Sequence, residues 1–495
     1  MRLRQLEEIR TAGDLAWFRP ALDRIRNLRT DPDPRLPGFL VAGPPLLLAR
    51  APGRLDVMGG IADYSGATVL ELPLDRSVSA ILQPQASPQA DVASLRNERW
   101  QFVSIPLDLL LSRELGVPGA LRTWSRQQGS DGWPDYVLGI AQLCLRRTGP
   151  SAARPGFRLL LESTVPEGSG IASSAALEVA AMAVISAGYD REVSPDQMAA
   201  DCQWVENHVV GAPCGIMDQL TSVSGRRDRL LRLRCQPGTI EGTIEIPDGY
   251  RFYGIDSGIR HAVAGSDYGT VRTAAFMGYR IIAELAGLPV RRDGVGVRVD
   301  DPRWGGYLAN LGPAEYATRY EERLPEEMLG AEFLSRYGGI TDVVTQVEPD
   351  RRYPVRPATG HPIREQERVE RFGNLLSRLG GEPNVAPELG RLMLASHRSY
   401  GACGLGSAGT DRLVELVVQE GAAAGIFGAK ITGGGSGGTV AVLGTDRAEP
   451  LVEGIADRYR EETGRTTQLF TKSGPGALET GVLRIDAEAA ATIMS

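Results

Sequence analysis

One segment constrains the fold of this chain more than any other: a glycine- and serine-rich stretch at residues 166–176, Pro-Glu-Gly-Ser-Gly-Ile-Ala-Ser-Ser-Ala-Ala. Alternating apolar and polar residues predict a strand at 157–163 before it, and an alanine-rich run predicts a helix at 175–186 after it. Glycine lets a backbone approach an anion closely, and the first amides of a helix favour negative charge. The stretch therefore indicates an anion-binding loop, or else an ordinary glycine-rich connection with a serine N-cap.

The scarcity of lysine narrows how such a loop could bind phosphate. Of 54 basic residues only Lys430 and Lys472 are lysines, and neither follows a glycine, so the chain has no Walker-type phosphate loop. Phosphate binding must then rely on arginine, backbone amides or a metal ion. The hydroxyls of Ser173 and Ser174 are candidate partners for a phosphate or for Mg²⁺.

A second glycine-rich segment occupies residues 429–438, Ala-Lys-Ile-Thr-Gly-Gly-Gly-Ser-Gly-Gly. An apolar run that predicts a strand at 439–443 follows it directly, which argues against a flexible linker. The segment is either the wall of a ligand cleft or a glycine-rich turn with no ligand.

Two carboxylates flank a segment of small and apolar residues, Glu206 and Asp218. Aspartate is common in turns and helix caps, so Asp218 alone is not diagnostic. A kinase, however, needs one carboxylate to hold Mg²⁺ and another beside the substrate hydroxyl. The four histidines show no metal-ligand spacing.

Length and charge set broad limits on the class of protein. A chain of 495 residues is too long for one ordinary compact domain, so we expect two lobes. The net charge of −7 argues against a protein that coats nucleic acid, which needs a basic face. Five cysteines without a CxxC pair fit a reducing compartment. Because no signal-peptide pattern and no long apolar run occur, we expect a cytoplasmic protein without a membrane partner.

Further elements are expected from periodicity and turn residues. Residues 1–30 carry apolar residues at helical spacing and predict a helix, with a proline-rich linker at 31–38. The other expected elements are strands at 46–51, ending at Pro52-Gly53, and at 67–72, 230–234, 239–246 and 252–257, and helices at 267–285, 364–379 and 387–398. Residues 1–44 and 288–365 either serve oligomerisation or partner binding, or are ordinary packing and surface loops; a monomer and a homodimer both stay open.

Three motifs occur in the order found in the GHMP small-molecule kinase superfamily. They are Ala51-Pro-Gly-Arg-Leu-Asp-Val-Met-Gly-Gly-Ile-Ala-Asp-Tyr-Ser-Gly66, the 166–176 loop and the 429–438 loop. Gly215-Ile-Met-Asp-Gln219 and the segment from Asp256 to Tyr268 are similar to segments of its galactokinase branch. Over roughly residues 45–480 the chain therefore resembles a galactokinase-like GHMP kinase.

This resemblance implies an α+β fold with two lobes and an active site in the cleft between them. The N-terminal lobe, 45–235, would be ribosomal protein S5 domain 2-like, and the C-terminal lobe, 236–495, would be ferredoxin-like, after a helical extension at 1–44. It also implies an enzyme that uses ATP and Mg²⁺ and phosphorylates a small sugar.

The resemblance further assigns roles to residues that match the family motifs. Asp218 and Arg54 would be catalytic, with the carboxylate beside the anomeric hydroxyl and the guanidinium stabilising charge on the transferred phosphoryl group. Glu206 and Ser174 would hold Mg²⁺. The triphosphate would contact Gly168, Ser169, Gly170, Ile171, Ala172, Ser173, Ser174, Gly434 and Gly435. The sugar would contact Gly60, Ile61, Ala62, Asp63, Gly215, Asp218 and Tyr268.

The first motif departs from the galactokinase pattern at two positions. Galactokinases carry Gly-Glu-His-Thr-Asp-Tyr, whereas this chain has Gly59-Gly-Ile-Ala-Asp-Tyr64. In galactokinases the Glu–His pair faces the C6 side of galactose, and Gly60 and Ile61 offer no side-chain acceptor to a C6 hydroxyl. The altered motif and Asp256-Ser-Gly-Ile-Arg-His261 are also similar to the kinase portion of plant L-arabinokinases.

L-Arabinopyranose is galactose without the C6 hydroxymethyl group, so we expect a sugar 1-kinase that makes L-arabinose 1-phosphate and ADP. A galactokinase, or a 1-kinase for another hexose or a uronic acid such as D-glucuronate, stays open as an alternative. A non-catalytic sugar sensor on the same scaffold is a further alternative, which the presence of Arg54, Glu206 and Asp218 disfavours.

Overall fold

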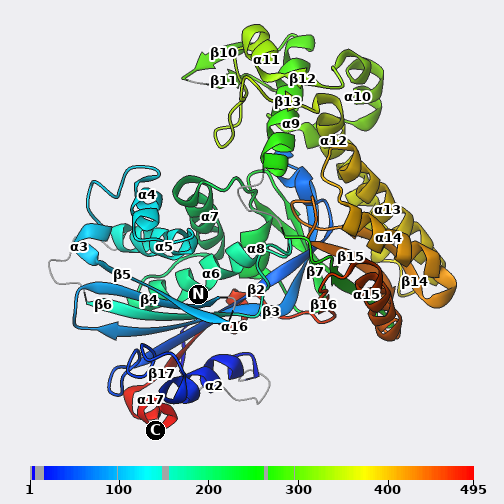
Figure 1. Cartoon of the computed structure of the whole chain (residues 1–495). Helices are drawn as coiled ribbons and strands as arrows, with labels where there is room; N and C mark the ends of the chain where they lie inside the picture. Colours follow the sequence, from blue (N-terminus) through cyan, green and yellow to red (C-terminus); the bar gives the residue numbers. More distant parts are fainter. Residues whose placement is uncertain are drawn as a thin grey trace.

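The computed structural model describes residues 3–5, 16–96, 98–147, 155–260, 266–294 and 296–494. The described chain forms two lobes, each built on its own β-sheet with helices packed against it (Figure 1). The expected α+β class and two-lobed organisation are therefore confirmed.

The N-terminal lobe is built on a nine-stranded sheet. Its strands lie in the order β1-β17-β2-β3-β6-β4-β5, while β7 pairs with β3 and β8 pairs with β7. The β1–β17 and β4–β6 pairs are parallel and the other pairs are antiparallel. The strands are β1 (Leu3–Gln5), β2 (Leu46–Met58), β3 (Thr68–Gln85), β4 (Gln89–Arg96), β5 (Arg99–Pro106), β6 (Gly156–Ser163), β7 (Arg229–Arg234), β8 (Thr239–Glu245) and β17 (Val482–Ile485).

Helices cover both faces of this sheet because its central strands carry apolar residues on both sides. Leu47 and Ala49 of β2 belong to the core beneath α5 and α6, whereas Leu46 and Leu48, which point the other way, belong to a second core with α2 and α17. The helices of this lobe are α2 (Arg19–Asn27), α3 (Leu107–Leu110), α4 (Ala120–Gln127), α5 (Trp133–Arg147), α6 (Ser173–Gly188), α7 (Pro195–Val205), α8 (Met217–Ser224), α16 (Ala477–Thr480) and α17 (Ala487–Met494).

Strand β2 extends beyond its predicted end at Pro52-Gly53 and continues to Met58. Its pairing with β3 shifts register between Pro52 and Arg54, which is a β-bulge. Proline has no amide to donate, and a β-carbon on Gly53 would lie 2.6 Å from the Ile171 carbonyl oxygen, so the bulge falls where the 166–176 loop approaches the strand. The Arg54 amide donates to that carbonyl at 3.0 Å, which positions Arg54 beside the loop.

The C-terminal lobe is built on a four-stranded antiparallel sheet in the order β14-β15-β9-β16. Its first strand in the chain, β9, lies between the third and the fourth, which is the arrangement of a ferredoxin-like βαββαβ unit. The strands are β9 (Tyr250–Asp256), β14 (Ile426–Ile431), β15 (Thr439–Thr445) and β16 (Leu469–Phe470). The main helices are α9 (Ser266–Leu285), α12 (Val355–Leu376), α13 (Ala386–Ala402), α14 (Ala408–Glu420) and α15 (Glu449–Thr463).

Most of the segment 288–365, which the sequence left unassigned, forms a small module that projects beyond α9 and α12, and its residues 355–365 form the start of α12 (Figure 1). Its elements are β10 (Val290–Asp293), β11 (Gly296–Val299), α10 (Pro313–Arg319), β12 (Met328–Leu329), α11 (Gly330–Tyr337) and β13 (Arg352–Tyr353). Its core is rich in tyrosine and is continuous with Ile61 and Tyr64 of the first motif. The module therefore packs directly behind the expected sugar side.

The expected helix at 1–30 is wrong for residues 3–5, which form β1 and extend the sheet by pairing with β17. The edge of β17 offers unpaired backbone groups that an added strand can satisfy. Residues 19–27 do form a helix, α2, and residues 6–15 lie outside the described residues. Strands β8 and β17, although they follow residue 235, both join the N-terminal sheet. The domain limits at 44 and 235 themselves stay predictions.

Among the described helices, none is both long enough and apolar enough to cross a membrane.

Candidate active site

A cavity of about 190 Å³ lies between the two lobes and gathers residues from all three motifs. Three sequence segments far apart in the chain meet there: the first motif with Arg54 and Asp63, the 166–176 loop, and the 429–438 loop. Its lining residues are Arg54, Asp63, Gly168, Gly170, Ala172, Ser173, Ser174, Pro213, Cys214, Gly215, Met217, Asp218, Asp267, Tyr268, Gly434, Gly435 and Ser436.

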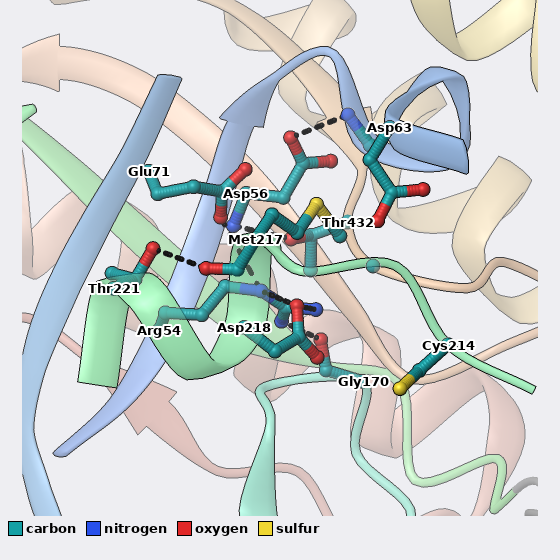
Figure 2. Close-up of polar contacts among 12 residues, drawn as sticks. Arg54, Asp56, Asp63, Glu71, Gly170, Cys214, Met217, Asp218, Thr221 and Thr432 are labelled. Carbon is teal, nitrogen blue, oxygen red and sulfur yellow. Dashed lines mark hydrogen bonds and ion pairs between the residues drawn. The ribbon is translucent and has the colours of Figure 1, made fainter. Parts of the chain in front are cut away.

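Arg54 and Asp218 form an ion pair at the base of this cavity. Asp218, in the first turn of α8, accepts from Arg54 Nε at 3.0 Å and lies 2.7 Å from its Nη2 (Figure 2). The Arg54 side chain is 3% exposed and that of Asp218 is 20% exposed, so the carboxylate is the member that reaches the cavity. Arg54 Nη1 also donates to the Gly170 carbonyl at 2.7 Å, which ties the pair to the phosphate-loop candidate.

Two further carboxylates lie behind Arg54 that the sequence motifs did not single out as functional. Glu71 Oε2 lies 3.3 Å from Arg54 Nε, and both Glu71 and Asp56 are fully buried. Burial raises the pKa of Glu71 well above its ordinary value, and Asp56 adds to this. Burial alone would lower the pKa of Arg54, but Asp218, Glu71 and Asp56 together raise it. In the sequence, Glu71 could have been noticed as an acidic residue inside the apolar strand predicted at 67–72.

The 166–176 loop turns sharply before α6, which begins at Ser173. Gly168, Gly170 and Ala172 have φ values of 67°, 71° and 60°, and the α6 N-cap, Ala172, provides no side-chain cap. The first amides of α6 therefore face the cavity without an internal partner, as an anion site requires. Ser169 and Ile171 differ from the expectation: both side chains are 1% exposed and absent from the lining, and the Ser169 hydroxyl accepts from Arg260 at 2.9 Å.

The two glycine-rich loops lie close together, and the first residue of β15 bonds to the 166–176 loop. Thr439 Oγ1 donates to the Ser169 carbonyl at 2.8 Å. A β-carbon on Gly433 would lie 2.5 Å from the Gly170 carbonyl oxygen. Residue 433 must therefore be glycine for the loops to approach this closely, and Gly434 and Gly435 complete the cavity wall.

Of the expected metal ligands, Ser174 lines the cavity, whereas Glu206 is buried next to it and does not line the cavity. Burial raises the pKa of Glu206 to about 7, and a hydrogen bond from Ser174 acts in the opposite direction. Gln219 Nε2 donates to Glu206 at 2.7 Å and to Glu178 at 3.2 Å, while Gln219 Oε1 and Glu178 Oε1 are buried without a hydrogen-bond partner. These are oxygen donors of the kind Mg²⁺ prefers. Within the described residues, no cluster of three His, Cys, Asp or Glu side chains could hold a metal.

Asp63 is the residue that the first motif presents to the cavity besides Arg54. Its side chain is almost fully buried, and burial, followed by Asp218, raises its pKa to about 7. A β-carbon at Gly215 would overlap the Asp63 carboxylate, so Gly215 leaves the room that this side chain occupies. Tyr268 packs edge-on against Tyr64 with ring centroids 5.7 Å apart, and it closes the wall beside Asp63.

The other expected sugar contacts are not on the cavity wall. Ile61 and Ala62 are at most 1% exposed, and neither they nor Gly60 lines the cavity. Ile61 instead packs in the tyrosine-rich core of the 288–365 module. The first motif therefore turns residues 60–62 toward the protein interior.

A second cavity, of about 450 Å³, adjoins the first and shares Gly168, Ser173 and Ser174 with it. Its wall includes the aromatic residues Trp133 and Tyr136, together with arginines from β4 and α4. The sequence motifs gave no indication of this cavity. Trp133 and Tyr136 lie in the first turn of α5, a helix that was not predicted from the sequence.

Comparisons with known proteins agree with this geometry. The family "GHMP kinases N terminal domain" matches residues 135–226, and "GHMP kinases C terminal" matches residues 368–461. An L-arabinokinase of Arabidopsis thaliana is 39% identical over 89% of this chain, and the chain spans only 47% of that relative. A galactokinase of Chloroflexus aggregans is 30% identical over 88% of this chain and 93% of its own length. The crystal structure of Lactococcus lactis galactokinase complexed with galactose has the same fold, with a TM-score of 0.67 at 17% identity over 93% of this chain and 98% of its own.

The fold, the paired glycine-rich loops and these matches define a small-molecule kinase, and the chain belongs to the GHMP kinase family. Its relatives lie in the galactokinase branch of that family. The chain is thus an ATP-dependent sugar kinase.

Proposed function

We propose that this kinase transfers the γ-phosphoryl group of ATP to the anomeric hydroxyl of L-arabinose, giving L-arabinose 1-phosphate and ADP. The observation that carries the choice of sugar is the inward turn of residues 60–62, which leaves Asp63 as the first motif's acceptor in the sugar cavity. A site with no partner for a C6 hydroxyl disfavours galactose. The 39% identity to an L-arabinokinase supports the same sugar.

The sugar would lie in the 190 Å³ cavity between Asp63 and Asp218. Asp218 would accept the hydrogen bond of the anomeric hydroxyl and so orient its oxygen toward the phosphoryl group. Arg54, fixed by Asp218, Glu71 and the Gly170 carbonyl, would stabilise the charge that develops during transfer. Phosphoryl transfer depends mainly on such positioning and charge stabilisation, because the protein forms no covalent bond.

The triphosphate would lie over the N-terminus of α6, with the backbone of Gly168 to Ser174 on one side and Gly434 and Gly435 on the other. The adjoining 450 Å³ cavity, with Trp133 and Tyr136, has the size and aromatic wall suited to the nucleoside. Glu206 and Ser174 would hold Mg²⁺, which supplies charge neutralisation on the phosphates when bound.

Initial rates on L-arabinose, D-galactose and D-glucuronate, each with saturating ATP, test the proposed sugar. We expect the highest kcat/KM on L-arabinose. D-Glucuronate should be the poorest, because its C6 carboxylate needs a cation, and among the described lining residues Arg54 alone is basic and already paired. A higher kcat/KM on D-galactose would overturn the proposal.

A galactokinase is the second candidate, because a galactokinase relative aligns over 93% of its length. The two candidates differ in what the first motif offers the sugar's C6 side. The burial of Ile61 and the absence of a side chain at Gly60 favour L-arabinose.

A further inference from the structure

Three successive backbone amides of the first motif are each held by a buried side chain. The acceptors come from three different elements, α12, β2 and α13, and all three are fully buried. The bonds run from Gly59 N to Glu365 Oε1 at 3.3 Å, from Gly60 N to Asp56 Oδ1 at 3.0 Å, and from Ile61 N to Tyr400 Oη at 2.9 Å. Two of these acceptors, Glu365 and Tyr400, come from distant helices, and the third, Asp56, comes from the first motif itself.

Tyr400 occupies the space that a side chain on residue 60 would take. A β-carbon built on Gly60 would overlap the Tyr400 hydroxyl oxygen and would lie 2.9 Å from its Cζ and 2.7 Å from Asp56 Oδ2. Gly60 also has a φ of 46°, a left-handed conformation that favours glycine. The glycine therefore does not open a pocket, because the tyrosine fills the position.

Lys430 contacts both Asp56 and Tyr400. Its ammonium group pairs with Asp56 Oδ2 at 2.5 Å and lies 5.2 Å from the centre of the Tyr400 ring. The Tyr400 hydroxyl in turn donates to the Gly433 carbonyl at 3.1 Å. A β-carbon on Gly435, which lines the cavity, would lie 3.3 Å from the Tyr400 ring. Tyr400 thus connects the sugar-side motif with the glycine loop on the opposite wall.

From this geometry we infer that Tyr400 is a positioning residue that determines sugar specificity. Its hydroxyl holds Ile61 away from the cavity and fills the place of a side chain at residue 60. The first motif therefore offers Asp63 to a sugar, but it provides neither room nor a hydrogen-bond partner for a C6 hydroxymethyl group. The inference rests on the proposed function, in which L-arabinose is the substrate.

The test compares Tyr400→Phe with Tyr316→Phe, a matched control. Tyr316 is equally buried in the same core, and its hydroxyl donates to the Arg356 carbonyl at 3.3 Å, far along the chain from the first motif. For each variant, kcat and KM are measured with L-arabinose, D-galactose and ATP. Removing the Tyr400 hydroxyl should raise the KM for L-arabinose about tenfold, the effect of losing one or two hydrogen bonds, with less change in the KM for ATP.

The decisive readout is the ratio of kcat/KM for L-arabinose to that for D-galactose. It should fall at least fivefold in Tyr400→Phe and stay at the wild-type value in Tyr316→Phe. Gly60→Ala disturbs the same contact, because its β-carbon would displace the Tyr400 hydroxyl, and it should lower the same ratio. This variant tests the role of Tyr400 if Tyr400→Phe does not fold. An unchanged ratio in the folded variants overturns the inference.

Failure of the proposed function gives a different result. If wild-type enzyme prefers D-galactose, the proposed substrate is wrong whatever the variants do. If wild-type enzyme prefers L-arabinose and the variants keep that preference, only the role of Tyr400 is wrong.

Discussion

Arg54 and Asp218 form an ion pair in which the arginine is buried and the carboxylate reaches the cavity. Arg54 is enclosed by Asp218, Glu71 and the Gly170 carbonyl, and its own side chain is 3% exposed. Asp218 is the one carboxylate of this group with appreciable exposure to the cavity, since Asp56 and Glu71 are fully buried. Asp56 and Glu71 thus lie on the buried side of Arg54, and Asp218 lies on its cavity side.

Asp218→Asn should lower kcat by about 10³-fold while changing sugar binding only a few-fold, because the amide keeps the shape but is a poorer acceptor for the hydroxyl proton. Steady-state kinetics and sugar titration of the same preparation measure the two effects. Asp267→Asn, on the same cavity wall, is the control and should lose less than about tenfold. Retained activity in Asp218→Asn would contradict the assigned role of Asp218. Absence of phosphorylation by the wild type would instead support the sensor alternative.

The burial of Asp63 predicts a pH-dependent affinity for sugar. Because its pKa is raised to about 7, the carboxyl group is mostly protonated at pH 6 and mostly ionised at pH 8. The ionised form is the stronger acceptor for sugar hydroxyls, so the Kd for sugar without nucleotide should decrease as the pH rises through 7. Calorimetric titration at several pH values measures this. Asp63→Asn should bind more weakly and lose the pH dependence; a variant that kept it would assign the titration to another group.

At the level of elements, the loop before α6 combines conformations that few residues adopt. Ala172 lies at φ 60° immediately before α6, whose N-terminus is the proposed phosphate site. A left-handed conformation is costly for residues with a β-carbon and most costly for β-branched ones.

Ala172→Val should therefore destabilise the loop by about 1–2 kcal/mol and raise the KM for ATP, whereas Ala172→Gly should keep both near the wild-type values. Thermal unfolding and ATP-dependent kinetics of the two variants measure this. Equal behaviour of valine and glycine would show that the backbone conformation at residue 172 does not control nucleotide binding.

Most elements near the site could be predicted from the sequence because their patterns are local. The helices predicted at 175–186, from an alanine-rich run, and at 267–285 correspond to α6 and α9 within two residues at each end. The continuation of β2 past Pro52-Gly53 could not be predicted, because it depends on a bulge matched to a loop more than 100 residues away. Strand β1 likewise depends on an edge provided by β17 at the other end of the sequence.

The site was predictable only in part, and for the same reason. Asp218, Arg54, Asp63 and the glycine loops lie in motifs, and the structure brings them to one cavity. Tyr400 and Glu71 lie outside any motif, and only the folded chain shows what they contact. Gly60 and Ile61 were expected on the cavity wall from their place in the motif, but the packing of Tyr400 turns them inward.

At the scale of the whole molecule, a buried ion pair joins the two lobes. Asp56 is on β2 of the first sheet and Lys430 is on β14 of the second, and both side chains are fully buried at a separation of 2.5 Å. Removing one partner of such a pair leaves an uncompensated charge in the interior. The position of one of the chain's two lysines, which had no role in the sequence, is explained by this contact.

Lys430→Met should lower the free energy of unfolding by about 3–5 kcal/mol. Lys472→Met, which removes the chain's other lysine from an exposed position, should change it by less than about 0.5 kcal/mol. Urea unfolding of the two variants makes the comparison. Similar small effects in both would mean that the ion pair between the lobes contributes little to stability.

The central claim, a sugar 1-kinase that prefers L-arabinose, is tested most directly by internal competition. Equal concentrations of L-arabinose and D-galactose are incubated with the enzyme and limiting ATP, and the products are identified by phosphorus and proton NMR. Because both sugars compete for one site, the product ratio equals the ratio of kcat/KM values. We expect mainly L-arabinose 1-phosphate, with the phosphate coupled to the anomeric proton. A predominance of galactose 1-phosphate, or phosphate on any other hydroxyl, would contradict it.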